Sequence, residues 1–514
     1  MARRLMGKQR GTTHAYPSRC SATGTPESSG SAGQPAAATA GPTSVRWRLC
    51  LSARAQLQRL SLQQLVASTG RAPAAADFTP TRVVVVDVER PLPSFEIDST
   101  HPGGHQAVWM LVRLHARPLG ALTLTAADLP MSSAGVDVLV QQRWGATIEQ
   151  HLRIHGASVG AEVGGDSPAP PWNSCVLLPS AQPSVSVVVP TFRRPADVVR
   201  CVESILATGY PNLEILVVDN APSDVSTASA VTERFAGDAR VRYLSEAIPG
   251  ASRARNRGVA HAGGDIVAFA DDDVVVDRYW IAALVNGLEL HPDVDCVTGL
   301  VLPQSMDTPV EMLFEHFGGF NRGYVQRKFD LAQRRGDTLL YPYTAGALGA
   351  SNNAAFRRSA LSRPDAFDVR LGPGTPAFGA EDQDAFVSLL RRGKRLLYEP
   401  AALVHHRHRG DYSALRWQIF TYGAGLSAAL VHWALKERAV AVELTRRVLA
   451  DLPQVMRGGY RAQSLQSASE AFPSNLRTLE RLGYLYGPVA YARAVVRDRR
   501  LQRSMSRSTA RKHQ

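Results

Sequence analysis

Three consecutive aspartates, Asp271, Asp272 and Asp273, follow an apolar run that ends at Phe269 and Ala270. The run predicts a buried β-strand, and ligands bind beyond the carboxyl ends of strands in open α/β sheets. Clustered carboxylates repel one another unless a hard cation neutralises them, and Mg²⁺ or Mn²⁺ prefers such oxygen ligands. The position of the aspartates therefore indicates a metal-assisted site for a diphosphate.

A second acidic pair, Glu381 and Asp382, stands in a Gly-rich context about a hundred residues later. One of these carboxylates would supply a base that takes a proton from an acceptor. Alternatively, the pair merely opens a helix expected over 384–390, because acidic side chains suit the positive end of the helix dipole.

Arg255 and Asn256 lie in a segment with three arginines between Gly250 and Gly258. The planar guanidinium group suits phosphate oxygens, and an amide can bind a ribose or a base edge. These two residues are therefore candidates for nucleotide contact. The alternative is a solvated helix face.

Three histidines, His405, His406 and His408, follow a short apolar run. Neutral imidazole is a competent Mn²⁺ ligand, so one of them would complete an oxygen-rich metal site. The alternative is a basic, solvated loop that includes Arg407 and Arg409.

The elements that must position these groups alternate between strand and helix from residue 184 onward. Asp219 ends one of the strands, where it is either a partner for a nucleotide base or ribose or a turn-forming aspartate. The pattern predicts an α/β fold with a parallel, doubly wound sheet. The expected strands are 185–190, 213–219, 241–244 and 265–269, and the expected helices are 197–207 and part of 250–262.

Before this region, we expect a disordered leader over 1–44 and a small α+β module of unknown role over 45–165. A Gly-, Pro- and Ser-rich linker follows at 156–184. Within the module, the expected helices are 45–65 and 144–154, and the expected strands are 83–88 and 109–114.

After this region, the sequence predicts a helical C-terminal region over 413–490 and a basic tail over 491–514. The uncharged stretch 417–435 leaves three alternatives: a membrane span, an interfacial helix, or a helix packed on the core. Its polar and glycine residues make it a poor candidate for a span.

The formal charge of +13 comes from the termini. Residues 1–60 and 491–514 carry +8 and +7, which leaves about −2 for residues 61–490 (13 − 8 − 7). The core is therefore not expected to bind nucleic acid, whereas the tails either contact anionic lipid or stay solvated. Five scattered cysteines and the lack of an N-terminal apolar signal favour the cytoplasm.

As an ordered set, the motifs resemble those of the family-2 glycosyltransferases, which have the GT-A fold with a Rossmann-like nucleotide half and an acceptor half. The resemblance covers about 184–425, with the GT-A domain expected over 184–412. It rests on Ser186–Thr191, Val218–Asp219, Ala254–Gly258, Phe269–Asp273 and Gly379–Asp382.

The resemblance implies a UDP-, dTDP- or GDP-linked sugar donor, Mn²⁺ or Mg²⁺, and inversion at the anomeric carbon. Asp219 would hold the nucleotide base, and Asp271 would contact the ribose. The residues that would bind the donor are Pro190, Thr191, Arg193, Asp219, Arg255, Asn256, Asp271 and Asp272.

The resemblance implies Asp273 as a metal ligand, with Asp271 beside it. It also implies His406 as a second protein ligand of the metal, and His405 and His408 remain alternatives to His406. Further along the chain, Asp382 would be the general base, and Glu381 would orient the acceptor hydroxyl.

Processive polysaccharide synthases of this family carry Gln-x-x-Arg-Trp. Here Arg416 and Trp417 are present, but Ser413 occupies the Gln position, so we expect a non-processive enzyme. Its acceptor would be a glycan, a lipid-linked glycan or a metabolite, for example in cell-wall or polysaccharide biosynthesis. It would work in the cytoplasm or, as a peripheral protein, at the inner face of the plasma membrane. A nucleotidyltransferase and a non-catalytic sugar-binding scaffold are the alternatives.

Overall fold

The computed structural model describes residues 62–64, 66, 78–97, 104–155, 182–332, 340–343, 346–361, 366–450 and 473–510. The expected leader over 1–44 and most of the linker over 156–184 lie outside these residues, as does the expected helix over 45–65 apart from 62–64.

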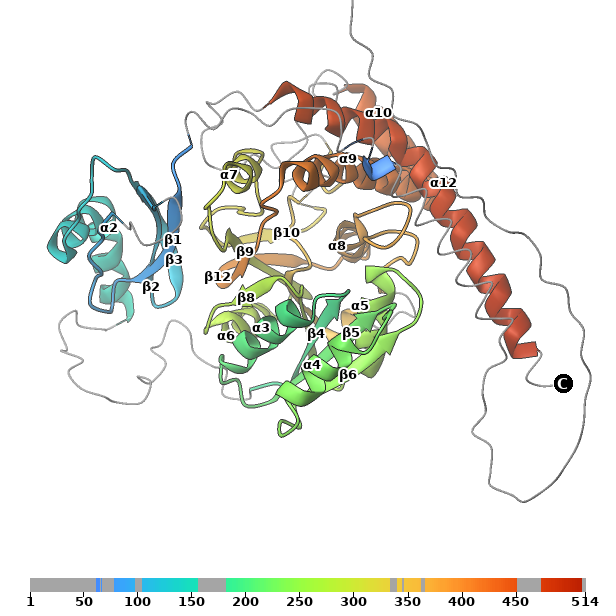
Figure 1. Cartoon of the computed structure of the whole chain (residues 1–514), viewed down its shortest axis with the longest axis horizontal. Helices are drawn as coiled ribbons and strands as arrows, with labels where there is room; N and C mark the ends of the chain where they lie inside the picture. The colour runs from blue at the N-terminus through green and yellow to red at the C-terminus, as the bar shows by residue number, and fades with distance from the viewer. Residues whose placement is uncertain are drawn as a thin grey trace, which may run out of the picture. The chain divides into compact units, whose positions relative to one another are not determined.

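The region after residue 184 is organised around one mixed β-sheet (Figure 1). Strands β6, β5, β4 and β7 lie side by side and parallel, and helices connect them, as the alternating pattern predicts. The elements are β4 (Val185–Thr191), α3 (Pro195–Leu206), β5 (Leu213–Asn220), α4 (Ser226–Arg234), β6 (Val241–Glu246), α5 (Ala251–His261) and β7 (Ile266–Ala270).

The other half of the sheet is mixed, so the parallel arrangement expected from the sequence holds only for the first half. Strand β11 runs antiparallel to both β7 and β9, whereas β12 is parallel to β9. This half comprises β8 (Val274–Val276), α6 (Trp280–Glu289), β9 (Cys296–Pro303), α7 (Pro309–His316), β10 (Arg327–Phe329), β11 (Asn353–Arg357), α8 (Glu381–Arg391) and β12 (Leu396–His406).

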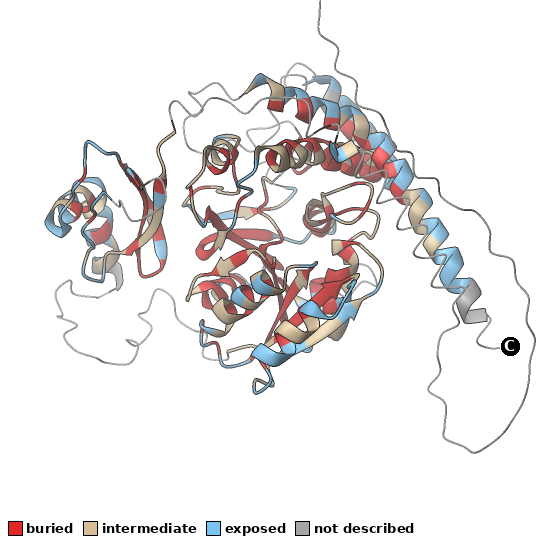
Figure 2. Cartoon of the chain, in the orientation of Figure 1, coloured by how far each residue is buried: buried red, intermediate tan, exposed pale blue. Residues whose placement is uncertain are grey.

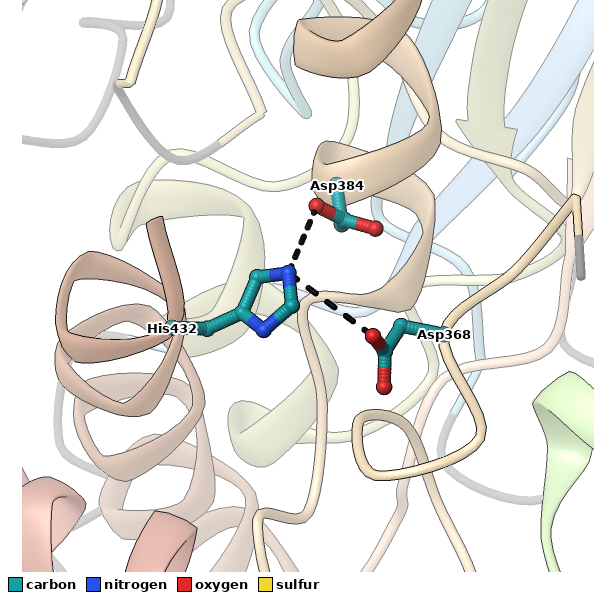
Figure 3. Close-up of side chains that lie close together, drawn as sticks. All are labelled: Asp368, Asp384 and His432. Carbon is teal, nitrogen blue, oxygen red and sulfur yellow. Dashed lines mark ion pairs between the residues drawn. The ribbon is translucent and has the colours of Figure 1, made fainter. Parts of the chain in front are cut away.

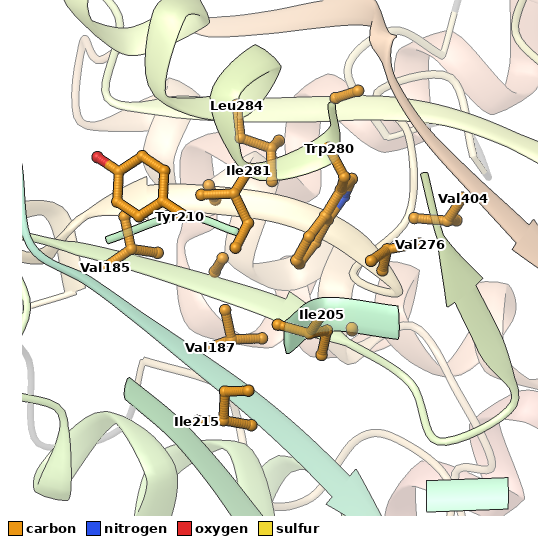
Figure 4. Packing of buried hydrophobic residues seen from close by; sticks show 14 of the residues in the cluster. Val185, Val187, Ile205, Tyr210, Ile215, Val276, Trp280, Ile281, Leu284 and Val404 are labelled. Carbon is orange, nitrogen blue, oxygen red and sulfur yellow. The ribbon is translucent and has the colours of Figure 1, made fainter. Parts of the chain in front are cut away.

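Alternating side chains of the central strands build a core on each face of the sheet. Val187 packs with Ile205 of α3 and Trp280 of α6 on one face (Figure 4). Val188 points to the other face, where it packs with Ala254 of α5 and α8 residues. Figure 2 shows the central strands as buried. This two-sided burial explains the continuous apolar runs of the strand sequences.

The N-terminal module is a three-stranded sheet, β1 (Thr81–Asp87), β2 (Ala107–Leu114) and β3 (Arg117–Leu124), with helix α2 (Ser133–His155). The α+β character is as predicted, but the sequence did not identify β3 or the first half of α2. Trp109 and Leu111 of β2 pack with residues of β9 and β12, and Arg113 Nη1 lies 2.9 Å from Asp277 Oδ2.

The C-terminal region is helical, with α9 (Tyr412–Lys436), α10 (Arg438–Ala450) and α12 (Ser474–Ala510). The segment 417–435 lies within α9 and buries most of its apolar residues, so it packs on the core. No helix in the described ranges has the length and apolar character needed to cross a membrane. The boundary expected at 490 falls inside α12, so much of the expected basic tail is helix.

Two close approaches fix helix positions. An added Cβ at Gly258 of α5 would lie 2.3 Å from Val188 Cγ1, so α5 rests directly on β4. An added Cβ at Gly423 of α9 would lie 2.3 Å from the Glu480 carbonyl oxygen of α12. Both contacts require residues without side chains.

We expect Gly258→Ala to lower the free energy of unfolding by about 1–3 kcal/mol, because the methyl group forces α5 away from β4. Chemical denaturation of the purified variant would measure this change. Gly237→Ala is the matched control, since an added Cβ there meets no atom within 4 Å. Equal stability of the two variants would contradict the close packing of α5.

Candidate active site

The aspartate triplet lies where the sequence places it, directly after β7. Because β7 pairs with β4, the triplet meets the end of β4. The Thr191 hydroxyl donates a hydrogen bond to Asp272 Oδ2 at 2.7 Å. Two of the expected site residues are therefore joined across neighbouring strand ends.

Arg194, not Arg193, binds the triplet. Its Nη1 donates to Asp272 Oδ1 at 2.9 Å and to Asp273 Oδ2 at 2.6 Å. Arg193, the expected donor-site residue, is exposed and places its guanidinium 5.0 Å from the Phe192 ring centroid. The signal available in the sequence was the position of Arg194 directly before Pro195, which begins α3.

Arg255 bridges the two acidic motifs. Its Nη1 donates to Glu381 Oε1 and its Nη2 to Asp271 Oδ1, both at 2.8 Å. The side chain is almost completely buried. Both terminal nitrogens of Arg255 are thus bound to carboxylates, and its expected contact with the nucleotide stays a prediction.

Asn256 likewise makes contacts within the protein, and its expected nucleotide contact stays a prediction. Its amide nitrogen donates to the Phe367 carbonyl oxygen at 2.8 Å, and its amide oxygen accepts from the Phe367 backbone N–H at 2.9 Å. Both polar atoms of the side chain are thus used to hold the segment that precedes α8.

The acidic pair opens α8, and its two carboxylates have different surroundings. Glu381 is buried against Arg255, whereas Asp382 is half-buried and accepts backbone N–H donors from Ser351 at 3.3 Å and Gln383 at 2.8 Å. Burial raises the pKa of both carboxyls above the usual range, despite the nearby guanidinium group. Of the two, Asp382 is the more exposed.

The triplet members also differ electrostatically. Burial raises the pKa of Asp272 to about 6. Burial also acts to raise the pKa of Asp273, but the His406 ring and the Arg194 guanidinium outweigh it and hold this pKa below its usual range. Of Asp272 and Asp273, Asp273 is therefore the more readily ionised and the better ligand for a cation.

Among the histidines, His406 is the one that faces the triplet. Its Nε2 lies 3.4 Å from Asp273 Oδ1, and its Nδ1 lies 3.2 Å from His408 Nδ1. His408 Nε2 in turn lies 2.6 Å from Glu315 Oε1 of α7. His405 is the next residue along β12, so its side chain points to the opposite face of the sheet. Of the three histidines, His406 is therefore the neighbour of Asp273, and its role as a metal ligand stays a prediction.

These donors fit a divalent cation. Burial lowers the pKa of His406 to about 4, so its ring is neutral at neutral pH and can offer a lone pair. The separation of Asp273 Oδ1 and His406 Nε2 is compatible with two ligands of one ion. Mixed oxygen and imidazole donors suit Mn²⁺ well.

The expected base-binding residues lie at the ends of β4 and β5. Asp219 stands in register with Thr191. It is buried, and the Tyr243 hydroxyl donates to its Oδ2 at 2.9 Å. Burial raises its pKa. Pro190 is half-buried beside it on β4. The sequence did not identify Tyr243 as a member of this group.

Asp368, Asp384 and His432 form a second charged cluster (Figure 3). His432 Nε2 lies 3.3 Å from Asp384 Oδ1 and 3.8 Å from Asp368 Oδ2, which is close enough for a shared cation. However, Asp368 already accepts from Arg370 Nε at 2.8 Å, and Asp384 from the Trp433 indole N–H at 2.8 Å. We interpret the cluster as an ion-pair clamp between α8 and α9.

Residues 186–363 match the family model described as Glycosyl transferase family 2. A glucosyl-dolichyl phosphate glucuronosyltransferase of Haloferax volcanii is 26% identical over 245 residues, which cover 46% of this chain and 73% of that protein. A pre-mycofactocin glycosyltransferase of Mycobacterium tuberculosis is 30% identical over 229 residues, which cover 44% of this chain and 43% of that protein.

Among solved structures, a mannosyltransferase of Pyrobaculum calidifontis in complex with GDP-mannose and Mn²⁺ is 19% identical, with a TM-score of 0.39. The match covers 70% of this chain and 96% of that chain. The chain spans less than half the length of its mycobacterial relative. The matching family model and the related glycosyltransferases agree with the motifs at the strand ends. Residues 186–363 therefore match the family-2 glycosyltransferases, and the chain is similar to enzymes of that family.

Proposed function

We propose that this enzyme moves one sugar from a nucleoside-diphosphate donor to a hydroxyl acceptor, with inversion at the anomeric carbon and with a divalent cation. The observation that carries the proposal is the bridge made by Arg255. Its guanidinium joins Asp271, at the end of the nucleotide-type half of the sheet, to Glu381, beside the half-buried Asp382. A donor side and an acceptor side are thereby held in one site.

On the acceptor side, Asp382 takes the proton of the attacking hydroxyl. As the new bond from oxygen to the anomeric carbon forms, the bond from that carbon to the phosphate oxygen breaks, and its electron pair leaves with the nucleoside diphosphate. A raised pKa makes the Asp382 carboxylate a stronger base than an ordinary aspartate. Attack opposite the leaving group gives inversion in one step.

On the donor side, Asp273 and His406 would hold Mn²⁺ or Mg²⁺. A cation bound there would neutralise charge that develops on the diphosphate leaving group. Arg194 lies beside both Asp272 and Asp273, so it is placed to bind a phosphate oxygen when the donor enters. Thr191 fixes Asp272, and Asp219 supports the base-binding end. The bound nucleotide would be UDP, dTDP or GDP.

For the acceptor, we propose a glycan, a lipid-linked glycan or a metabolite, glycosylated without processive elongation. The Haloferax relative is named for a glucosyl-dolichyl phosphate, which favours a lipid-linked acceptor here. Ser413 in place of glutamine supports the non-processive mode. We place the enzyme in the cytoplasm at the membrane face, where buried free thiols such as Cys201 and Cys296 stay reduced. A role in cell-wall or polysaccharide biosynthesis fits this location.

The Asp382→Asn variant should lose about 10²–10⁴-fold in kcat, because the amide cannot take the hydroxyl proton. Donor-nucleotide stabilisation should stay near that of the unmodified enzyme. Product formation and thermal shifts would measure the two effects separately. Asp137→Asn, an exposed carboxylate on α2, is the control. Near-normal turnover of Asp382→Asn would show that another group is the base.

Thermal melting with UDP, dTDP, GDP and ADP, with and without Mn²⁺, should reveal a metal-dependent stabilisation by one nucleotide. Asp273→Ala should abolish this dependence, because it removes the most readily ionised ligand of the site. Asp128→Ala, in a fully exposed turn, should behave as the unmodified protein. A stabilisation by nucleotide that is the same with and without Mn²⁺ would rule out the proposed metal site.

Glu315→Gln should weaken Mn²⁺ binding by about tenfold, a typical loss when a partner of a metal-bound histidine is changed. The Glu315 carboxylate accepts from His408 Nε2, which leaves His408 Nδ1 to accept from His406 and keeps His406 Nε2 free for metal. Manganese titration followed by electron paramagnetic resonance would measure the affinity. His405→Asn, on the opposite face of β12, is the control. Unchanged affinity in Glu315→Gln would exclude this positioning role.

A further inference from the structure

Helix α12 has two different long faces. The buried face packs on α9, and Figure 2 shows it on the side toward that helix. Its members are small or apolar: Leu476, Leu479, Gly483, Gly487, Ala490 and Ala494. Among the residues that the structure describes, this contact accounts for the position of the helix, and the opposite face is exposed.

The opposite face carries an apolar stripe. Leu482 is 48% exposed, Leu485 76%, Val489 52% and Val496 46%. Their spacings of three, four and seven residues place them on one line along a helix. Large apolar side chains gathered on one exposed face indicate an interaction surface.

Arginines border and extend the stripe. Arg481 and Arg493 lie on its two edges, and Arg499, Arg500 and Arg503 continue it toward the end of α12; all five are exposed. No described acidic residue of α12 is exposed on this face. Glu480 is buried, and Asp498 accepts from Arg253 Nη2 at 2.8 Å.

We propose that this face of α12 docks the enzyme on an anionic phospholipid surface. The leucines and valines would enter the boundary between headgroups and acyl chains, and the arginines would lie among the lipid phosphates. The combination of an apolar line with arginine edges is typical of helices that lie in a membrane interface.

A second copy of the chain is the less suitable occupant. The three-four spacing also matches the seam of a coiled coil, in which flanking residues of opposite charge attract. Here Arg499 and Arg503 would fall within the seam, and Arg481, Arg493 and Arg500 at its edges. Two such faces would bring cation against cation, whereas an anionic lipid surface complements them.

The surface overlaps the basic tail 491–514, which the sequence offered for contact with anionic lipid, but it differs from the other candidate that the sequence offered. The segment 417–435 was a candidate for membrane contact, but α9 is packed between the core and α12. This proposal rests on the location at the membrane given under the proposed function, and it names the surface that makes the contact. This proposal is tested without measuring nucleotide binding or sugar transfer. The membrane contact and the proposed function can therefore each fail without the other.

The test is co-sedimentation of the full chain with phosphatidylcholine vesicles that contain or lack about a third phosphatidylglycerol. We expect binding to the anionic vesicles that decreases with salt. The double variant Leu485→Ser/Val489→Ser and the triple variant Arg499→Gln/Arg500→Gln/Arg503→Gln should each bind at least about tenfold more weakly. Melting curves would confirm that the variants, which change exposed side chains, remain folded.

Matched controls change exposed residues on other elements. Val138→Ser/Leu290→Ser removes exposed apolar side chains of α2 and of the residue directly after α6, and Arg82→Gln/Arg153→Gln/Arg257→Gln removes three exposed charges. Both controls should bind like the unmodified chain. Equal binding to neutral vesicles, or equal loss in controls and α12 variants, would overturn the proposal. A dimer that Leu485→Ser/Val489→Ser dissociates, without vesicle binding, would assign the face to a second copy.

Discussion

The site depends on one buried guanidinium. Arg255 is enclosed between the end of β7 and the start of α8, and it cannot lose its proton at any physiological pH. Burying a charge is unfavourable unless partners surround it, so Asp271 and Glu381 must both stay close to the guanidinium group. The aspartate triplet and the acidic pair, more than a hundred residues apart in sequence, are held together by this requirement.

Around the Arg255 bridge, strand ends and individual hydrogen bonds position the other residues of the site. The parallel strands β4, β5 and β7 end at the same edge of the sheet. The pairing of these strands therefore brings Thr191, Asp219 and Asp271 to that edge. The part of the site around Asp382 depends less on regular secondary structure. It depends on the amide of Asn256, which holds the backbone of Phe367, and on the N–H of Ser351, which fixes Asp382.

The sequence predicted β4, β5, β6 and β7 because they are short apolar runs that alternate with helical segments, and it placed the triplet and the acidic pair at a strand end and a helix start. It could not choose between Arg193 and Arg194, since backbone geometry at the start of α3 decides which side chain turns inward. Nor could it assign Asn256 or the His406–His408–Glu315 chain. Those depend on partners 111 and 93 residues away in the chain, whose proximity is a tertiary property.

The clamp formed by Asp384, Asp368 and His432 has a mechanical consequence. Helix α8 is fastened at its first residue by Arg255 and, one turn later, by His432 and Trp433 of α9. Asp382 lies between these two anchors. Its carboxylate therefore lies on a rigid part of α8. Under the proposed function, an acceptor hydroxyl would have to approach a base whose direction is already set.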